Sequence, residues 1–536
     1  MHLSQTKNAA CPSPVSTTSK DSRTMTLAKK HIAGAAATLA VVALLAGCTG
    51  SQGGAGSSAG ASSTLNLGII GEPTSWDPAQ AHVGHGLQPY QVVYDTLILR
   101  EADGTLSPML ATEWSYDDAR TALTLELRDG VTFSDGAPFD SEAVKANIEN
   151  LKNNNGRQAA QVAAVSSVDP VDADTVTINL SEPDPAFEFY LSQAAGLMGS
   201  PASLGTDAMI STPVGTGPYV MDAANSVAGS QLTFTARKDY WNPELQKFDT
   251  VVLKTYEELT ARLNALLSNQ VDATILDAST AEQADGKGDL STLKDYQVDW
   301  QGLLLLDRAG TQVPALADVR VRQAINYAID RKTMLDSTLR GYGDATQQVF
   351  GPDSGAYVDD LDSAYDYDPD RARDLLAEAG YADGFELPIY SGPGFETALA
   401  SLTQQLGDVG IAVKVQTVNT QTFLDDLTSG KIPVLYQNLF QGEPWVAINQ
   451  IISTDAIYNP FDSTDPELQG LIDAVQTGGT DSAERAKAVN EWVSKNAWFA
   501  PVYRIDQVYA YHSDRIKVEK QIQQAVPSIY NYAPAA

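Results

Sequence analysis

The chain has 536 residues, of which 43% are hydrophobic and 19% are charged, as in ordinary globular proteins. Its 67 acidic residues outnumber its 35 basic residues, which gives a formal net charge of −32. A surface with this much negative charge repels nucleic acid and anionic lipid headgroups. Nucleic-acid binding is therefore excluded as a main function. The cysteines are Cys11 and Cys48. The remainder of the chain therefore has no cysteine nucleophile, disulfide or thiolate metal site.

A run of apolar and small residues covers positions 32–47, directly before Cys48, and Lys29 and Lys30 precede it. The run is shorter than the roughly 20 residues that a helix needs to span a bilayer. A basic flank, a short apolar run and small residues at its end are typical of a secretory signal. We predict that residues 1–47 are a leader and signal peptide, with Met25 as an alternative translation start.

The junction Leu45-Ala46-Gly47-Cys48 resembles the lipobox of bacterial lipoproteins. The resemblance implies that Cys48 is lipidated and becomes the mature N-terminus. Residues 48–64 follow with Gly, Ser, Ala and Thr, and about 16 residues of such flexible coil reach about 20–24 Å. We therefore expect an extracytoplasmic protein that a lipid holds on the outer face of the cytoplasmic membrane, with residues 48–64 as its tether. Removing residues 1–47 changes the formal net charge from −32 to −36, because five basic residues and one acid are lost.

Alternating patterns predict strands in the first half of the chain. Leucines alternate with polar residues over 123–127, and apolar residues alternate with polar ones over 175–180. Asp129-Gly130 predicts a turn after the first of these strands. A two-residue hairpin would place Val131 on the polar face of the returning strand, so we expect a bulge or a longer loop there.

Four amphipathic helices are predicted in chain order. Asp140 caps the first, Asp318 caps the second over 319–329, and Asp368-Pro369 begins the third, which Gly380 ends. The fourth covers about 483–493. Their apolar faces are Val144, Ile148 and Leu151; Val321, Ile325, Ala328 and Ile329; Leu375, Leu376 and Ala379; and Ala486, Val489 and Val493.

Two apolar segments in the second half, 303–306 and 501–503, read as buried strands. Strands that alternate with helices and show no fixed repeat indicate an α/β or α+β fold. About 200 residues lie between the two segments and about 235 lie before them, enough for a core on each side. We expect two lobes that are joined by two crossings of the chain.

Several segments, in order, resemble the peptide- and nickel-type (family 5) extracellular solute-binding proteins of bacterial ABC importers. Leu127 to Gly136 is similar to the family's LRxGVxFxDGxP element, and the acidic-capped helix after Asp140 follows it. The other matching segments are 106–114, 215–219, 319–331 and 367–381.

This resemblance implies an α/β, two-lobed, periplasmic-binding-protein-like clamshell of type II, with an extra subdomain in the first lobe. Lobe I would comprise residues 65–92, 211–300 and 505–536, the inserted subdomain residues 93–210, and lobe II residues 301–504. The resemblance also implies a monomer that buries a ligand between its lobes. Closure would present the loaded state to ABC permease subunits.

The segment that follows the first strand faces the ligand in this family, which makes His82, His85 and Gln88 candidate ligand contacts. A surface loop is the alternative interpretation for this segment. Some relatives bind nickel complexes, but no third histidine or cysteine lies near His82 and His85, so we predict no metal site.

A second candidate wall lies within 432–448, where an apolar strand precedes an aromatic and an acidic residue. In peptide-binding relatives, an aspartate shortly before the matching proline pairs with the α-amine of the ligand. This chain has Gln441 and Glu443 in that region. Trp445 would stack on a ligand or fill the core. The ligand-binding candidates from this segment are Tyr436, Asn438, Gln441, Glu443 and Trp445.

These observations predict an extracytoplasmic solute-binding lipoprotein. It would capture an oligopeptide or another small polar organic solute and deliver it to an ABC importer. A surface sensor or receptor that uses the same cleft is the alternative. A carboxylate-based glycoside hydrolase is less favoured, because no motif places its carboxylates, and the chain has no G-x-S-x-G element for a serine hydrolase. We expect no enzyme activity, catalytic residue, cofactor or metal.

Overall fold

The computed structural model describes residues 63–154 and 156–535. The predicted leader, Cys48 and nearly all of the predicted tether lie outside these residues. Thr64, which we assigned to the tether, already begins a strand and pairs with Thr250. No helix in the described ranges has the length and apolar character that crossing a membrane requires.

The main sheet has eleven strands in the order β15-β14-β16-β12-β17-β11-β1-β10-β9-β8, and β13 pairs with β17. Its pairing is mixed, because β1 runs parallel to β10 and β12 runs antiparallel to β16 and β17. The strands are β1 (Thr64–Ile69), β8 (Tyr219–Met221), β9 (Gln231–Ala236), β10 (Thr250–Thr255), β11 (Ala273–Leu276), β12 (Leu290–Leu305), β13 (Gly343–Ala345), β14 (Phe385–Ser391), β15 (Ile411–Thr417), β16 (Val434–Phe440) and β17 (Phe499–His512).

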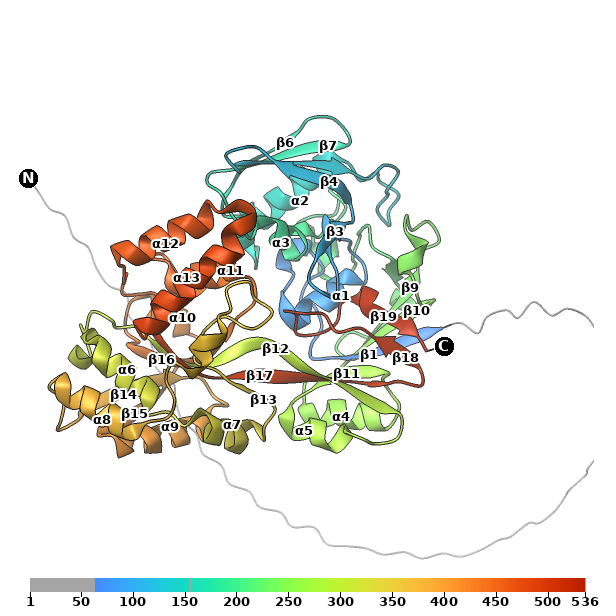
Figure 1. Ribbon diagram of the computed structural model, residues 1–536. Coiled ribbons are helices and arrows are strands. Elements are labelled where there is room, and N and C mark those ends of the chain that lie inside the picture. The colour runs from blue at the N-terminus through green and yellow to red at the C-terminus, as the bar shows by residue number, and fades with distance from the viewer. Residues whose placement is uncertain (1–62, 155, 536) are drawn as a thin grey trace, which may run out of the picture. The chain divides into compact units, whose positions relative to one another are not determined.

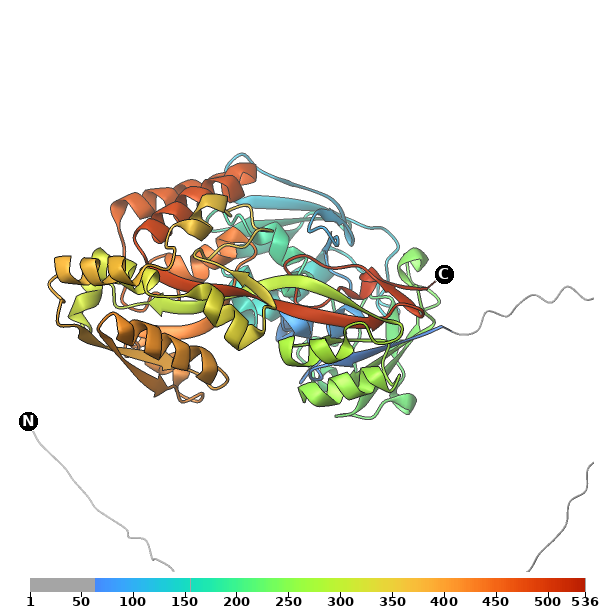
Figure 2. The same ribbon diagram turned by 60° about the horizontal axis from the view of Figure 1, so that its bottom comes forward.

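The two longest strands, β12 and β17, lie side by side along the middle of the described residues (Figures 1 and 2). The predicted segments 303–306 and 501–503 lie in these strands, apart from Leu306, which follows β12 directly. The pairing shifts register between Gln297 and Trp300 and again between Gln301 and Gly302. A Cβ on Gly302 would lie 2.5 Å from the Ala500 carbonyl oxygen, so only glycine permits this close approach.

Helices cover the two ends of the main sheet (Figure 1). At one end, α6 and α9 pack around β14, β15 and β16 through a shared apolar core. At the other end, α4 and α5 pack against β11 and β17. The α-helices are α1 (Leu87–Gln91), α2 (Ser141–Asn153), α3 (Phe187–Leu191), α4 (Leu259–Leu267), α5 (Ala278–Ala284), α6 (Val319–Tyr327), α7 (Arg331–Leu339), α8 (Pro369–Glu378), α9 (Glu396–Asp408), α10 (Phe423–Thr428), α11 (Pro444–Ala447), α12 (Pro466–Gln476) and α13 (Ser482–Lys495).

A separate four-stranded sheet, β4-β5-β7-β6, packs against α2. Its strands are β4 (Ala111–Tyr116), β5 (Ala122–Leu127), β6 (Val165–Pro170) and β7 (Thr175–Leu180). The predicted strands at 123–127 and 175–180 are confirmed as β5 and β7. Val131 and Phe133 are buried but form no strand, so the expected longer loop follows the Gly130 turn. Two short pairs complete the sheets: β2 (Ile98–Arg100) with β3 (Leu106–Pro108), and β18 (Ile516–Val518) with β19 (Tyr532–Pro534).

The four predicted helices are confirmed as α2, α6, α8 and α13. Asp140, Asp318 and Asp368 each accept a hydrogen bond from a first-turn N–H, and Gly380 has φ +89° after α8. The second helix ends at Tyr327, two residues before the predicted end, because Asp330 caps a new helix, α7. The predicted apolar faces are buried, apart from Ala379, which is partly buried.

Candidate functional site

A cavity of about 940 Å³ lies where distant stretches of the chain meet. Its volume is within the range of about 300–1,000 Å³ that is typical of small-molecule sites. Its wall is formed by residues from 83–85, 158–193, 298–299, 440–476 and 507–525. Residues that the sequence assigns to lobe I, to the inserted subdomain and to lobe II therefore all reach this cavity. The division into lobes itself stays a prediction.

The charged groups in the wall of the large cavity are carboxylates. Glu182 and Asp184 follow β7, Asp299 lies on β12, and Asp455 follows a π-helix at Ile448–Ile452. Among the described residues that line the cavity, none is lysine or arginine. The wall is therefore acidic on several sides.

Asp299 is the carboxylate whose surroundings are most unusual. It pairs in register with Phe440 on β16, which also lines the cavity. Burial alone raises the pKa of Asp299 to about 6, because the ionised form loses its water. No hydrogen bond or ion pair that would offset this loss is found for its carboxylate among the described residues.

Two other acids interact with each other, Asp184 in the cavity wall and Glu443 outside it. Asp184 accepts a hydrogen bond from the Ala186 N–H, and burial raises its pKa to about 6. Glu443 caps α11 by accepting from the Trp445 N–H, and burial raises its pKa to about 7. Arg100 lies near Glu443 and moderates that rise, but its guanidinium donates to Gln523 and is not part of the cavity wall. Asp184 is therefore mostly charged near pH 7, while Glu443 is about half protonated there, and each has a structural partner.

The rest of the wall combines apolar surface with amides. Trp445 and Phe440 line the cavity, and Trp445 is 5% exposed. Gln450 lies in the π-helix, a form that often marks functional positions. The Oε1 atom of Gln450 and the Nε2 atom of Gln524 are buried and have no hydrogen-bond partner. A buried polar atom without a partner is costly, so these two atoms are suited to a bound polar molecule.

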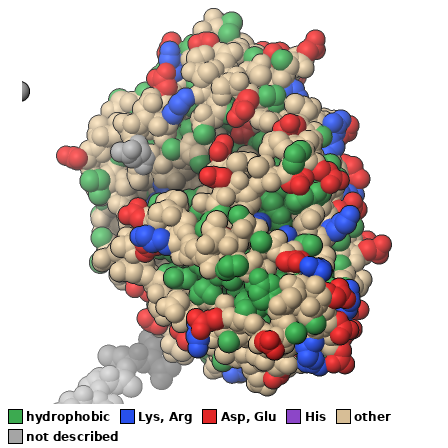
Figure 3. Space-filling model, turned by 90° about the vertical axis from the view of Figure 1, so that its left-hand side faces the viewer, with side chains coloured by type: hydrophobic (Ala, Val, Ile, Leu, Met, Phe, Trp, Pro, Cys, Tyr) green, Lys and Arg blue, Asp and Glu red, His purple; other side chains and the backbone are tan. Residues whose placement is uncertain are grey.

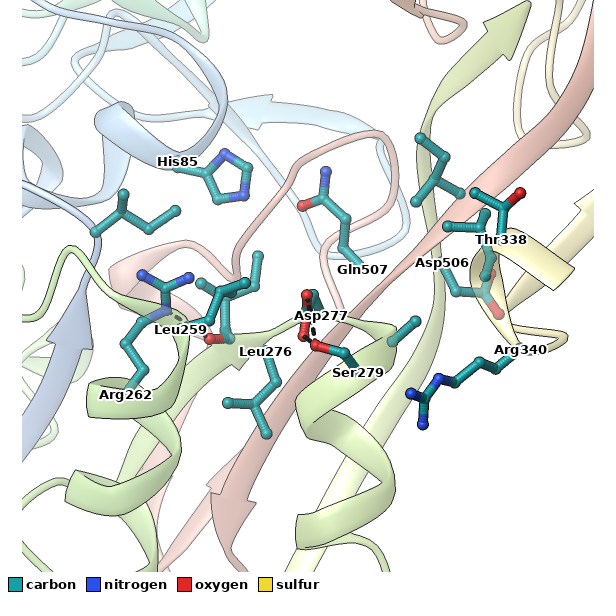
Figure 4. A pocket seen from close by; sticks show the side chains of 15 residues that line it. His85, Leu259, Arg262, Leu276, Asp277, Ser279, Thr338, Arg340, Asp506 and Gln507 are labelled. Atoms are coloured by element: carbon teal, nitrogen blue, oxygen red, sulfur yellow. Dashed lines mark hydrogen bonds between the residues drawn. The ribbon is translucent and has the colours of Figure 1, made fainter. Parts of the chain in front are cut away.

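A second cavity, of about 300 Å³, adjoins the first, and His85 and Gln507 line both. In Figure 4 the His85 ring and the Gln507 side chain extend into the same space, above Asp277 and Ser279 at the start of α5. Arg262 also points into this space from α4, and its guanidinium donates to the carbonyls of Ile275, Tyr256 and Glu257. The smaller cavity therefore has a cationic group that the larger one lacks.

The structure brings two of the eight predicted ligand contacts, His85 and Trp445, to the wall of the large cavity. Burial lowers the pKa of His85, which favours its neutral imidazole near pH 7. His82 is partly exposed and lies outside both cavity walls, and burial followed by the charge of Arg157 lowers its pKa. Glu443 lies beside the large cavity and caps α11.

The other predicted contacts have internal partners and lie outside the walls of both cavities. Gln88 is buried and donates to the Pro527 carbonyl and to the Tyr532 hydroxyl. Gln441 is buried between Arg504 and the Gln297 carbonyl.

Tyr436 and Asn438 are held by the same partner. The Tyr436 hydroxyl donates to Gln301 Oε1, and Asn438 accepts from Gln301 Nε2. Tyr436 is fully buried, in the core around β14 to β16. In this structure these side chains stabilise the strands around the cavity.

The acids Asp184 and Asp299 were missed by the sequence analysis. Asp184 lies in a Glu-Pro-Asp-Pro stretch, and Asp299 lies between the apolar residues Val298 and Trp300. A charged residue between buried neighbours is unusual, and this signal could have identified Asp299.

The described residues contain one cluster of possible metal ligands, Asp289, His512 and Asp514. His512 is 3% exposed. Its Nδ1 lies 2.7 Å from Asp289, and its Nε2 lies 3.0 Å from the Leu266 carbonyl oxygen. Because both ring nitrogens already have hydrogen-bond partners, this cluster is better explained as a structural contact between β17 and the segment before β12.

The sequence profile of the bacterial extracellular solute-binding proteins, family 5 (middle part), matches residues 105–454. The chain belongs to this family. Family 5 proteins are extracytoplasmic, bind peptides or related solutes, and serve ABC importers. The chain is 30% identical over 362 residues to the glutathione-binding protein GsiB of Escherichia coli (strain K12), a match that covers 64% of this chain and 67% of GsiB.

Solved structures of other proteins have a similar fold. HbpA2 from Haemophilus parasuis has a TM-score of 0.77 and 20% identity, over 88% of this chain and 100% of its own. DppA from Helicobacter pylori, in complex with the peptide STSA, has a TM-score of 0.72 and 20% identity, over 88% of this chain and 98% of its own. The predicted fold, a two-lobed α/β clamshell of the type II periplasmic binding proteins, is confirmed.

Proposed function

We propose that this family 5 protein captures a small polar organic solute, such as an oligopeptide, in the 940 Å³ cavity and delivers it to the permease of an ABC importer. The observation that carries this proposal is the composition of the cavity wall. Segments more than 400 residues apart in sequence, 83–85 and 523–525, line it together with 440–476. A solute that contacts all of them would stabilise a single arrangement of these segments.

The relatives support a small solute, such as a short peptide. GsiB is named for the tripeptide glutathione, and the DppA structure holds a tetrapeptide. Both proteins act by binding, so we infer that this chain is a binding protein and not an enzyme.

The proposed protein is a monomer that Cys48 anchors to the outer face of the membrane through a lipid. We also propose that β12 and β17 are the two crossings between lobe I (65–92, 211–300, 505–536) and lobe II (301–504). The register shifts around Gln301 lie at the proposed boundary, where a hinge needs irregular pairing.

Filling the cavity tests the proposal. Ala163 is exposed and lines the cavity, so Ala163→Trp should obstruct it. Thermal unfolding of the mature protein with solutes extracted from its host's growth medium should show stabilisation of the natural protein and none of Ala163→Trp. The control, Val171→Trp, changes a residue that is 64% exposed and outside the cavity, and it should respond like the natural protein. Equal stabilisation of all three proteins would exclude the cavity as the binding site.

A further inference from the structure

The charges around the large cavity define what kind of solute it can hold. Four carboxylates, from Glu182, Asp184, Asp299 and Asp455, reach its wall from three separate segments of the chain. The described lining residues include no lysine or arginine that would neutralise them. An anionic group placed among them would be repelled and would find no cationic partner in this wall.

Arg100 and Arg262 are held by contacts outside the wall of the large cavity. Arg100 is 6% exposed, donates to Gln523 and lies 5.0 Å from the ring centre of Phe189. Arg262 lines the smaller cavity and is held by three backbone carbonyls. Neither side chain is part of the wall of the large cavity.

Asp299 differs from Asp184 and Glu443 in how its charge is compensated. Asp184 and Glu443 each accept a hydrogen bond from a backbone N–H. Asp299 has no such donor among the described residues, although it is held on the central strand β12 beside the buried Trp300. A largely buried carboxylate without a partner is unfavourable in the empty protein, and a donor that carries positive charge removes that cost.

A second observation points to a ligand at the same place. Gln524 is 4% exposed and lines the cavity, yet its Nε2 has no hydrogen-bond partner. The Oε1 atom of Gln450, which also lines the cavity, likewise has no partner. The same wall that holds the carboxylates therefore also offers an unsatisfied donor and an unsatisfied acceptor. Such an arrangement suits a solute that itself has both donors and an acceptor oxygen.

We propose that the large cavity selects solutes that carry a positively charged nitrogen, an ammonium or guanidinium group, and that Asp299 is the residue that binds this group. The inference rests on the proposed function, since it specifies the solute class for the same cavity. Trp445 and Phe440 provide apolar surface for the remainder of the solute, and Gln524 donates to its oxygen. A solute whose charged groups are all anionic is rejected.

Charge-separated pools of natural solutes test the inference. A small-molecule extract of the host's growth medium is divided by ion exchange at pH 7.5 into cationic, neutral and anionic pools. The purified mature protein is dialysed against each pool, and mass spectrometry identifies the retained molecules. We expect every retained molecule to carry a basic nitrogen, with at least tenfold weaker retention by Asp299→Asn and unchanged retention by Asp374→Asn, which alters an exposed acid outside the cavity.

Three outcomes would overturn the inference. Retention of a molecule without a basic nitrogen, from any pool, would contradict the proposed preference. Retention from the cationic pool that Asp299→Asn does not weaken would place the cation elsewhere. The absence of retention from every pool, with no difference between the natural protein and Ala163→Trp, would also reject the proposed function, so the two failures can be told apart. Thermal unfolding of Asp299→Asn confirms that this isosteric variant is folded.

Discussion

At the scale of single residues, the unpaired Asp299 connects the stability of the empty protein with solute binding. Its pKa is raised by burial from 3.8 to about 6, so the folded protein binds a proton more tightly than the unfolded chain does. The free energy of unfolding therefore falls as the pH rises from about 4 to about 6, and the cost is fully present above that range. The carboxylate that would bind a cationic solute destabilises the empty protein at neutral pH.

We predict that Asp299→Asn stabilises the empty protein at pH 8 by about 1–2 kcal/mol, a value reduced from the full shift because the group is partly accessible. The gain should disappear below about pH 4, where the natural carboxyl is also neutral. Urea unfolding at pH 8 and pH 4 measures both values. A variant that is less stable than the natural protein at pH 8 would show that Asp299 has a stabilising partner.

Gln441, a predicted ligand contact, has a structural role in the described residues. Its Oε1 accepts from Arg504 Nε at 3.1 Å, and its Nε2 donates to the Gln297 carbonyl at 2.6 Å. We predict that Gln441→Leu destabilises the fold by about 2–3 kcal/mol, because it leaves buried polar groups unpaired. Gln421→Leu, at an exposed position, is the matched control. Unchanged thermal stability with weaker solute binding would restore Gln441 as a ligand contact.

The sequence predicted part of the site, for physical reasons that differ between residues. His85 and Trp445 were identified because a rare histidine and an aromatic residue follow strands of a familiar family pattern. Tyr436 and Gln441 are also polar or aromatic residues of this segment, but both are buried and their side chains are hydrogen-bonded to Gln301 and Arg504. Asp299 is brought to the cavity by pairing with Phe440, which lies far away in the chain. No local pattern contains that contact.

At the scale of elements, β12 and β17 determine how the parts around the cavity are connected. The two strands pair from Leu290 with His512 to Leu304 with Phe499, with three shifts of register between. The sequence indicated only short pieces of these strands, at 303–306 and 501–503. The remainder was missed because polar residues such as Gln297 and Gln301 interrupt the apolar pattern. Helices were easier to predict, because caps and apolar faces are local.

Gly302 tests the irregular pairing at the proposed hinge. A Cβ there would lie 2.5 Å from the Ala500 carbonyl oxygen and 2.6 Å from the Pro501 Cα, and backbone atoms cannot move aside cheaply. We predict that Gly302→Ala costs about 1–3 kcal/mol of stability. Gly407→Ala is the control, since Gly407 lies in α9 with open space around it, and it should be neutral or stabilising. Equal effects of the two changes would show that β12 and β17 separate easily at this point.

At the scale of the whole molecule, surface acids and cavity acids have different roles. On the face shown in Figure 3, acidic side chains are spread widely, with lysine and arginine side chains between them. Dispersed charge of this kind keeps a protein soluble and does not define a ligand. The carboxylates of the large cavity, in contrast, converge on one space, and burial raises the pKa of Asp184 and Asp299 to about 6.

The acidic cavity predicts a pH-dependent affinity for cationic solutes. Protonation of Asp184 and Asp299 near pH 6, and of Glu443 near pH 7, removes negative charge from around the solute. Because its pKa is lowered, His85 becomes positively charged only at a pH below the usual pKa of histidine, and this charge weakens binding further. Arg100 stays charged over the whole pH range. Affinity should fall at least tenfold between pH 8 and pH 5, as isothermal titration at both values would measure. Tighter binding at pH 5 would contradict the proposed charge preference.

The proposed lipid anchor is tested separately from solute binding, because Cys48 lies outside the described residues. Cys48→Ser should move the protein from the membrane fraction to the soluble fraction and leave its affinity for solutes unchanged. Cell fractionation, with detection of the protein in each fraction, measures the change. Continued membrane association of Cys48→Ser would contradict the lipoprotein assignment.

The central claim is that the 940 Å³ cavity holds a small solute that carries a positively charged nitrogen. Native mass spectrometry of the protein purified from its own host, before and after mild denaturation, tests it most directly. We predict a single released species of defined mass that carries a basic nitrogen and is missing from Ala163→Trp. A released species without a basic nitrogen, or one that Ala163→Trp retains equally, would contradict the account.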